Sequence, residues 1–149
     1  MNNYQRYVKE FHVKYNHPIS NIVKPLNQNG VETRSRWMKE EIQEFEDANN
    51  LVDQVDALCD LLYFAFGCAI EMGVDLGVPF QIVHQSNMSK PVNKFDSDGK
   101  IQKDGGFTSP TKMLETELLF QSRLKFKLLT NSDIDKQFQY KGKDNDREE

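Results

Sequence analysis

Apolar residues recur along most of the chain at three- and four-residue spacing, which is the period of an α-helix that packs on one side. Glycines, prolines and clusters of asparagine interrupt this pattern at intervals. The expected helices, in chain order, cover residues 3–16, about 33–50, about 52–72, about 79–89 and 111 to about 120. Thr33 or Ser35 is the expected cap of the second helix, because residues 17–30 have the composition of a loop. We therefore expect an all-α protein, a bundle of four to five helices.

Two stretches depart from the helical pattern. Residues 93–110 contain the turn sequences Asp98-Gly99 and Gly105-Gly106, and they predict an ordered loop or a short hairpin. Residues 121–129 alternate apolar side chains with lysine and favour no single secondary structure. The polar stretch from 141 to 149 predicts disorder at the C-terminal end.

The third expected helix is the most apolar segment of the chain. Nearly every position from Leu58 to Ile70 is apolar, which leaves no polar side for water, so we expect this helix to be buried on all sides. Asp60 interrupts the run, and an ionised carboxylate at a buried position is costly unless a positive charge meets it. Asp53 and Asp56 precede Asp60 at helical spacing, so the three carboxylates share one side of the helix.

A second group of acids lies on the preceding helix. Glu40, Glu41 and Glu44 fall on one face, while Ile42 and Phe45 lie on the opposite, apolar face. Carboxylates about 5 Å apart repel each other by roughly 3 kcal/mol at an effective dielectric constant near 20, so two facing acidic helices need a counter-charge. A site made of carboxylates alone, without His or Cys, favours Mg²⁺ or Mn²⁺ over Zn²⁺. The alternative is that the acids form only a solvated helix face.

The overall composition narrows the class of protein. A chain of 149 residues is long enough for one domain with a core. Its net charge of −4 argues against binding to a nucleic-acid polymer. Cys59 and Cys68 lie on opposite sides of the third helix, so we expect neither a disulfide between them nor a shared metal. No secretion signal opens the chain and no apolar run reaches the roughly twenty residues that span a bilayer, so we expect no membrane and a cytoplasmic location.

Four segments of the chain carry a resemblance to a known family. They are Arg-Trp-Met-Lys-Glu-Glu-Ile-Gln-Glu-Phe at 36–45, Asp-Ala-Leu-Cys-Asp-Leu-Leu-Tyr-Phe-Ala-Phe-Gly at 56–67, His-Gln-Ser-Asn-Met-Ser-Lys at 84–90 and Asp-Gly-Lys-Ile-Gln-Lys at 98–103. In this order they resemble the MazG-like, or phosphoribosyl-ATP pyrophosphohydrolase-like, branch of the all-α nucleoside triphosphate pyrophosphohydrolases. The resemblance implies a Mg²⁺-dependent enzyme, a homodimer or homotetramer, that splits a nucleotide between its α and β phosphates into a monophosphate and pyrophosphate. It also suggests the removal of noncanonical or excess nucleotides.

The resemblance assigns metal ligands to positions of this chain. The expected ligands of two or three Mg²⁺ ions are Glu40, Glu41, Glu44, Asp56 and Asp60. The family commonly has Glu three residues before the aspartate that matches Asp60, whereas this chain has Ala57 there. Asp56 or Asp53 would replace it, because on a helix a residue four positions away is as close as one three positions away. Glu41 is the expected catalytic base, which orients a water molecule and takes its proton.

Four further residues are expected to bind the substrate, and these are Asn87, Lys90, Lys103 and Trp37. Asn87 and Lys90 lie at the end of the fourth helix, in a segment that faces the substrate in the resembling family. Trp37 projects on the carboxylate side of its helix and would form a wall of the base pocket, and Lys103 would close over the phosphates from its loop. The alternatives are a tryptophan in the core and lysines that are merely solvated.

The resemblance covers about residues 4–112 and so divides the chain. We expect an all-α nucleoside triphosphate pyrophosphohydrolase domain at 1–112 and an extension at 113–149, partly helical and then a disordered polar tail. The alternative function is a non-catalytic helical module that binds metal, nucleotide or a partner. A di-iron bundle is not expected, because it needs Glu-x-x-His pairs and the sequence contains none.

Overall fold

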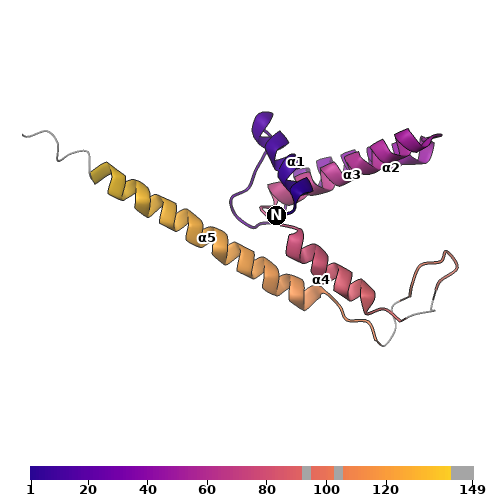
Figure 1. Cartoon of the computed structure of the whole chain (residues 1–149). Helices are drawn as coiled ribbons and strands as arrows, with labels where there is room; N and C mark the ends of the chain where they lie inside the picture. Colours follow the sequence, from indigo (N-terminus) through magenta and orange to yellow (C-terminus); the bar gives the residue numbers. More distant parts are fainter. Residues whose placement is uncertain (92–94, 103–105, 142–149) are drawn as a thin grey trace, which may run out of the picture.

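The computed structural model describes residues 1–91, 95–102 and 106–141, with side chains as far as residue 131. Its helices are α1 (Asn3–Lys14), α2 (Gln28–Asp47), α3 (Leu51–Glu71), α4 (Gly77–Met88) and α5 (Thr111–Lys141). Within the described residues the β-structure is limited to one isolated bridge between Phe95 and Ile101, in the loop after α4. The predicted all-α class is confirmed (Figure 1).

Asparagine side chains begin the first three helices. The amide oxygens of Asn2, Asn27 and Asn50 accept hydrogen bonds from backbone N–H groups in the first turns of α1, α2 and α3. The prediction that Thr33 or Ser35 caps the second helix is wrong, because Asn27 caps it instead and accepts from the N–H of Gly30 at 2.8 Å. Gly30, which the sequence suggests is part of a loop, therefore lies in the first turn of α2.

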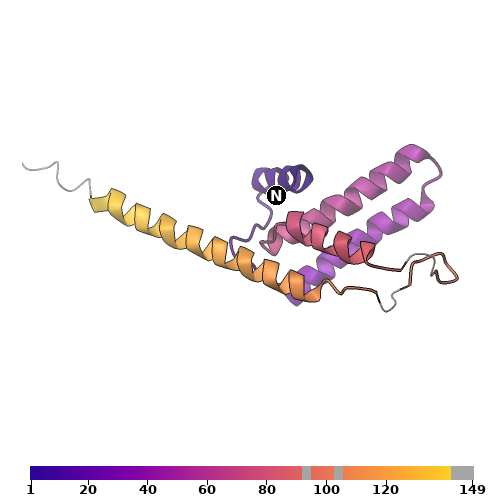
Figure 2. The ribbon, with the colours of Figure 1, turned by 60° about the horizontal axis from the view of Figure 1, so that its bottom comes forward.

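The helices α2 and α3 form an antiparallel pair joined by a short turn, and α1 packs across the C-terminal half of α3 (Figure 2). Val8 and His12 of α1 are buried, at 2% exposure each. The rings of Phe11 and Tyr63 pack edge to face, with their centroids 5.5 Å apart. The antiparallel pair α2 and α3 thus forms the longest helix–helix contact of the fold, and α1 covers part of the surface of α3.

The prediction that the third helix is buried on all sides is wrong for the single chain. Leu58 and Leu62 are 45% and 57% exposed, and Asp60 is exposed as well. The reason is that α1 and α2 pack against only part of the surface of α3. The helix therefore presents an apolar stripe at helical spacing, formed by Leu51, Val55, Leu58 and Leu62.

The turn between α3 and α4 connects the helical pair to the rest of the molecule. Gly73 has a φ of +68°, and a Cβ there would clash with the carbonyl oxygen of Ile22, so only glycine fits. From α1, the fully buried Gln5 donates to the carbonyl oxygen of Val74 at 2.7 Å and accepts from the N–H of Leu76 at 3.0 Å. One side chain thereby satisfies both backbone groups of the turn that face α1.

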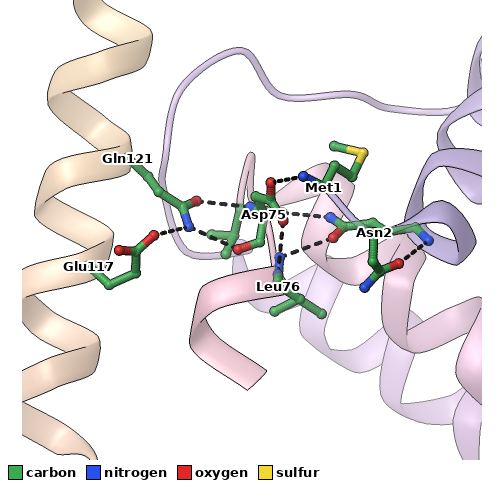
Figure 3. Close-up of polar contacts among 9 residues, drawn as sticks. Met1, Asn2, Asp75, Leu76, Glu117 and Gln121 are labelled. Atoms are coloured by element: carbon green, nitrogen blue, oxygen red, sulfur yellow. Dashed lines mark hydrogen bonds and ion pairs between the residues drawn. The ribbon is translucent and has the colours of Figure 1, made fainter. Parts of the chain in front are cut away.

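A second glutamine attaches α5 to the same turn. The amide of Gln121 accepts from the N–H of Asp75 and donates to its carbonyl oxygen, both at 2.9 Å (Figure 3). Lys125 donates to the carbonyl oxygen of Ser20 at 3.2 Å, one turn further along α5. The stretch 121–129, for which the sequence favours no single structure, is therefore part of one long helix whose C-terminal half extends beyond the other helices (Figure 1).

The sequence predicts no disulfide between the two cysteines and no segment that spans a membrane. Both Cys59 and Cys68 are free thiols. Among the described residues, no helix combines the length and the apolar content needed to cross a bilayer.

Candidate metal and nucleotide site

Two contacts set the register between α2 and α3. The guanidinium of Arg34 donates to a carboxylate oxygen of Glu71 at 2.6 Å, and this ion pair is nearly buried. One turn along α2, the ring of Trp37 packs on Phe64 with centroids 5.5 Å apart. Since the helices are antiparallel, the next turn of α2 carries Glu41 opposite the turn of α3 that precedes Phe64.

Glu41 is the carboxylate at the centre of the acidic residues. Its side chain is buried, with the residue 9% exposed, and its Oε2 atom has no hydrogen-bond partner within the described part of the chain. Burial raises the pKa of Glu41 above its ordinary value, and the charges of Glu44, Asp60, Glu40 and Asp56 raise it further, in that order. These four acids come from both helices, so the carboxylates predicted from the sequence do face one another.

The two candidate replacements for the family's missing glutamate are placed differently. Asp56 acts on Glu41 electrostatically, whereas Asp53 is not among the charges that raise the pKa of Glu41. Asp53 instead takes part in the cap of α3, where the side chain of Asn50 donates to its carboxylate at 2.6 Å. Asp56 is therefore the acid whose charge acts on Glu41 together with Asp60, while Asp53 is engaged in the cap of α3.

The acidic residues are not closed into a coordination shell. Glu40, Glu44, Asp56 and Asp60 are exposed, and the described residues contain no group of three His, Cys, Asp or Glu side chains close enough to hold a metal ion as they stand. The buried Oε2 atom of Glu41 nevertheless has no hydrogen-bond partner among the described residues, and the four charges that act on Glu41 all belong to carboxylates. This donor set fits a hard divalent cation such as Mg²⁺, which takes oxygen ligands and keeps waters.

The sequence profile of the phosphoribosyl-ATP pyrophosphohydrolase family matches residues 8–87, which is more than half of the chain. The chain belongs to this family. The resemblance found in the sequence is thereby confirmed, and the family implies a pyrophosphohydrolase that acts on a nucleotide. No curated protein matches the chain.

The family match includes all five acids and ends within α4. It therefore covers the helical pair that carries Glu41 together with the C-terminal part of α1, while α5 lies outside it. The long helix α5, outside the matched residues, is attached to the turn before α4 through Gln121.

Three residues beside the acids were not predicted from the sequence. Arg34, Glu71 and Gly67 form a compact contact, in which a Cβ on Gly67 would lie only 2.6 Å from Nη1 of Arg34. The guanidinium also lies 5.1 Å from the ring centre of Trp37. Arg34 shares the helix face of Trp37 and Glu41 at separations of three and seven residues, and this spacing is the pattern that points to it.

The predicted substrate residues fall into two groups. Trp37 lies one turn from Glu41 on the same face of α2. Asn87 is exposed and Lys90 half-buried at the C-terminal end of α4, a helix that packs on α5 and, in the described part of the chain, not along α2 or α3. Lys103 lies outside the described residues. One chain therefore brings Trp37 to the acids but does not bring Asn87 and Lys90 there.

Proposed function

We propose that the protein hydrolyses a nucleoside triphosphate, or the phosphoribosyl-ATP for which its family is named, between the α and β phosphates, with Mg²⁺ or Mn²⁺ as cofactor. The products would be a monophosphate and pyrophosphate. The observation that carries this proposal is the buried, unpaired oxygen of Glu41 among four further carboxylates. Such a concentration of negative charge destabilises the fold unless a cation binds there. A polyphosphate with its divalent ions supplies both the cations and the remaining oxygen ligands.

Four of the five acids are the proposed ligands of the divalent ion, and the fifth, Glu41, is the proposed base. Glu44 and Asp60, whose charges raise the pKa of Glu41 most, would hold the divalent ion together with Glu40 and Asp56. When bound, the ion would neutralise the phosphates and lower the pKa of the attacking water. The carboxylates would hold the ion, and through it the phosphate chain, along the face of α2, because their backbone positions are set by the pairing with α3.

Glu41 is the proposed catalytic base. Its pKa lies above that of an ordinary glutamate, mainly because of burial, which makes its carboxylate a better proton acceptor. Its unpaired Oε2 atom is free to accept the proton of a water molecule that attacks the phosphate chain. The bond between the bridging oxygen and one phosphorus breaks as the water oxygen bonds to that phosphorus, and the proton goes to Glu41.

A second copy of the chain is part of this proposal. The apolar stripe of α3 includes Leu62, which is 57% exposed, and α2 adds Ile42 and Phe45 at 45% and 41%. Exposed apolar side chains in such number are typical of a surface covered by a partner. Since Asn87 and Lys90 do not reach the acids of their own chain, we propose that they serve the site of the second copy in a homodimer or homotetramer. Sedimentation that gives a monomer at micromolar concentration would contradict this.

The reaction is tested with the purified protein, Mg²⁺ and a panel of nucleotides that includes phosphoribosyl-ATP. Pyrophosphate and orthophosphate are measured separately, and the Glu41→Gln variant serves as the control. Release of pyrophosphate with a monophosphate, lost in the variant, supports the proposal. Orthophosphate alone would mean that a different bond is broken. If no nucleotide is hydrolysed but Mg²⁺ still raises the melting temperature, the protein is a non-catalytic binding module instead.

A further inference from the structure

A groove of about 360 Å³ lies between α1, the turn before α4, and α5. We call it the α1–α5 groove, and its lining includes Lys9 of α1, Val74 and Asp75 of the turn, and Phe120 and Lys125 of α5. The volume lies within the range of about 300–1,000 Å³ that is usual for small-molecule sites. The groove contains none of the five acids of the candidate site, and its α5 wall lies beyond the residues that match the family.

The α5 wall of the groove is an apolar stripe. Phe120, Leu124 and Leu128 follow one another at four-residue spacing, and they are 60%, 47% and 61% exposed. Ile70 at the end of α3 and Val74 of the turn add further apolar surface to the lining. Such a surface gains free energy when an apolar body removes it from water.

Two ammonium groups stand at this groove without a carboxylate partner. Lys125 is half-buried, and its Nζ donates to the carbonyl oxygen of Ser20 at 3.2 Å, which leaves further N–H groups of the same ammonium for a second acceptor. Neither Lys125 nor Lys9 forms an ion pair with any described residue. Burial lowers the pKa of Lys125, the charge of Lys9 lowers it further, and the charge of Asp75 opposes this shift without cancelling it. The two like charges therefore act on each other, and an anion beside them would relieve the repulsion.

The two acids of the groove already have other partners. Asp75 forms an ion pair with the amino group of Met1 and accepts a hydrogen bond from the N–H of Gly77 at 2.9 Å (Figure 3). The carboxylate of Glu117 accepts from the amide of Gln121 at 2.8 Å. The charged groups that still lack a partner of opposite sign are thus the two lysines, so the groove favours an anion over a cation.

We propose that the α1–α5 groove binds a small carboxylate with an aliphatic body. Its carboxylate lies beside Lys9 and Lys125, where charge-assisted hydrogen bonds hold it, and its aliphatic chain covers Phe120, Leu124 and Leu128. Because the ligand touches both α1 and α5, it fastens the long helix to the remainder of the molecule. This site is independent of the proposed hydrolysis, and its occupancy can be measured without any turnover.

The groove is tested by calorimetric titration of the full-length protein with straight-chain carboxylates from butanoate to decanoate. We expect saturable binding that tightens about fourfold with each added methylene until the groove is filled, the gain typical of burying one such group. 1-Octanol, which has the chain without the charge, should bind at least about tenfold more weakly than octanoate. Octanoate should also slow hydrogen exchange in both α1 and α5.

Matched lysine variants test the anionic end of the ligand. Lys9→Met and Lys125→Met keep the length of the side chain but remove its charge, and each should weaken octanoate binding about tenfold, the effect typical of one lost charged contact. Lys127→Met, at an exposed position of α5 outside the groove, is the control and should bind octanoate as the unchanged protein does. Circular dichroism checks that each variant folds. Lys9 is exposed, so Lys9→Met carries the test even if Lys125→Met does not fold.

Three results would refute the proposal. The first is that Lys9→Met and Lys125→Met bind octanoate as tightly as Lys127→Met does. The second is that 1-octanol binds as tightly as octanoate, which would mean that the groove is merely apolar. The third is that no carboxylate binds saturably, and if hydrogen exchange in α5 then slows as the protein concentration rises, the groove is covered by a second copy of the chain instead.

Discussion

Replacing Glu41 by Gln is expected to make the metal-free protein more stable, although it removes the proposed base. Glu41 is buried, its Oε2 atom has no partner among the described residues, and four other carboxylates act on it. Glutamine has nearly the same shape but no charge, and its amide N–H groups can donate to the neighbouring carboxylates. The substitution therefore removes an electrostatic cost without opening a cavity.

The expected gain follows from the cost of a buried polar atom without a partner. Such an atom costs about 1–3 kcal/mol, and more when it is charged. We take about 2 kcal/mol as the gain at pH 8, which corresponds to a rise of about 4–8 °C in melting temperature for a chain near 150 residues. The added charge repulsion from the neighbouring acids acts in the same direction.

The pH dependence has a defined sign. Because the pKa of Glu41 in the folded protein lies above its ordinary value of 4.5, the protonated form fits the fold better than the ionised form. The stability that this gives is complete below about pH 4.5 and is lost as the pH rises through the folded pKa. The melting temperatures of the two proteins should therefore be similar in acid and diverge as the pH rises.

Thermal unfolding followed by circular dichroism, between pH 4 and pH 8 with a chelator present, checks this expectation. Added Mg²⁺ should then raise the melting temperature of the unchanged protein more than that of the variant, because the ion binds the charged site. If Glu41→Gln melts at a lower temperature than the unchanged protein at pH 8 without metal, the reasoning that Glu41 is a costly buried charge is refuted.

Three further substitutions test the surroundings of the site. Gly67→Ala should lower stability by about 1–3 kcal/mol in chemical denaturation, because its Cβ would lie 2.6 Å from a nitrogen of Arg34; unchanged stability would mean that Arg34 is free to move. Mixing Glu41→Gln subunits with Lys90→Ala subunits should restore pyrophosphate release that neither variant shows alone, if Lys90 serves the partner's acids; no recovery after confirmed subunit exchange would contradict this. Gln121→Ala should speed hydrogen exchange in α5, because two hydrogen bonds to the turn before α4 are lost, and slow exchange in that variant would mean that apolar contacts alone hold the helix.

The helices could be predicted from the sequence where an apolar period and a capping residue agree. The sequence places the third helix within about one residue at each end, because the apolar period begins near Val52 and Gly73 ends it. The second helix begins at Gln28, several residues before the start at about residue 33 that the sequence predicts. Gly30 there has the appearance of a loop residue, and only the hydrogen bond to Asn27 shows that it lies inside the first turn.

The burial of α3 could not be predicted from its composition. An apolar run predicts that the helix needs to be covered, but it does not say whether the same chain or another one covers it. Here α1 and α2 take one part of the surface and leave Leu58 and Leu62 exposed. Lys90 is a similar case, because the sequence indicates a substrate-binding residue but not whether it serves the acids of its own chain or those of a second copy.

The shared face of the acids, in contrast, could be predicted, because it depends only on spacing within one helix. The pairing between helices depends on packing, and for that reason Arg34 and Glu71 were missed although both lie on the predicted face. Spacing thus indicates which residues can act together on one helix, and the contacts of Gly67 and Trp37 decide how the two helices meet.

The ion pair between Arg34 and Glu71 lies at the end of the α2 and α3 pair away from the acids, where it can hold the two helices together. The acidic half of the α2 and α3 pair repels itself without a cation, so the metal-free helices must be held together from the other end. There the nearly buried pair of Arg34 and Glu71 and the packed rings of Trp37 and Phe64 hold the two helices in one register. These contacts fix the backbone of the two helices that carry the carboxylates, so binding a cation does not first require the helices to assemble. The repulsion between the carboxylates is thus opposed by contacts that lie one and two turns away from Glu41 along α2.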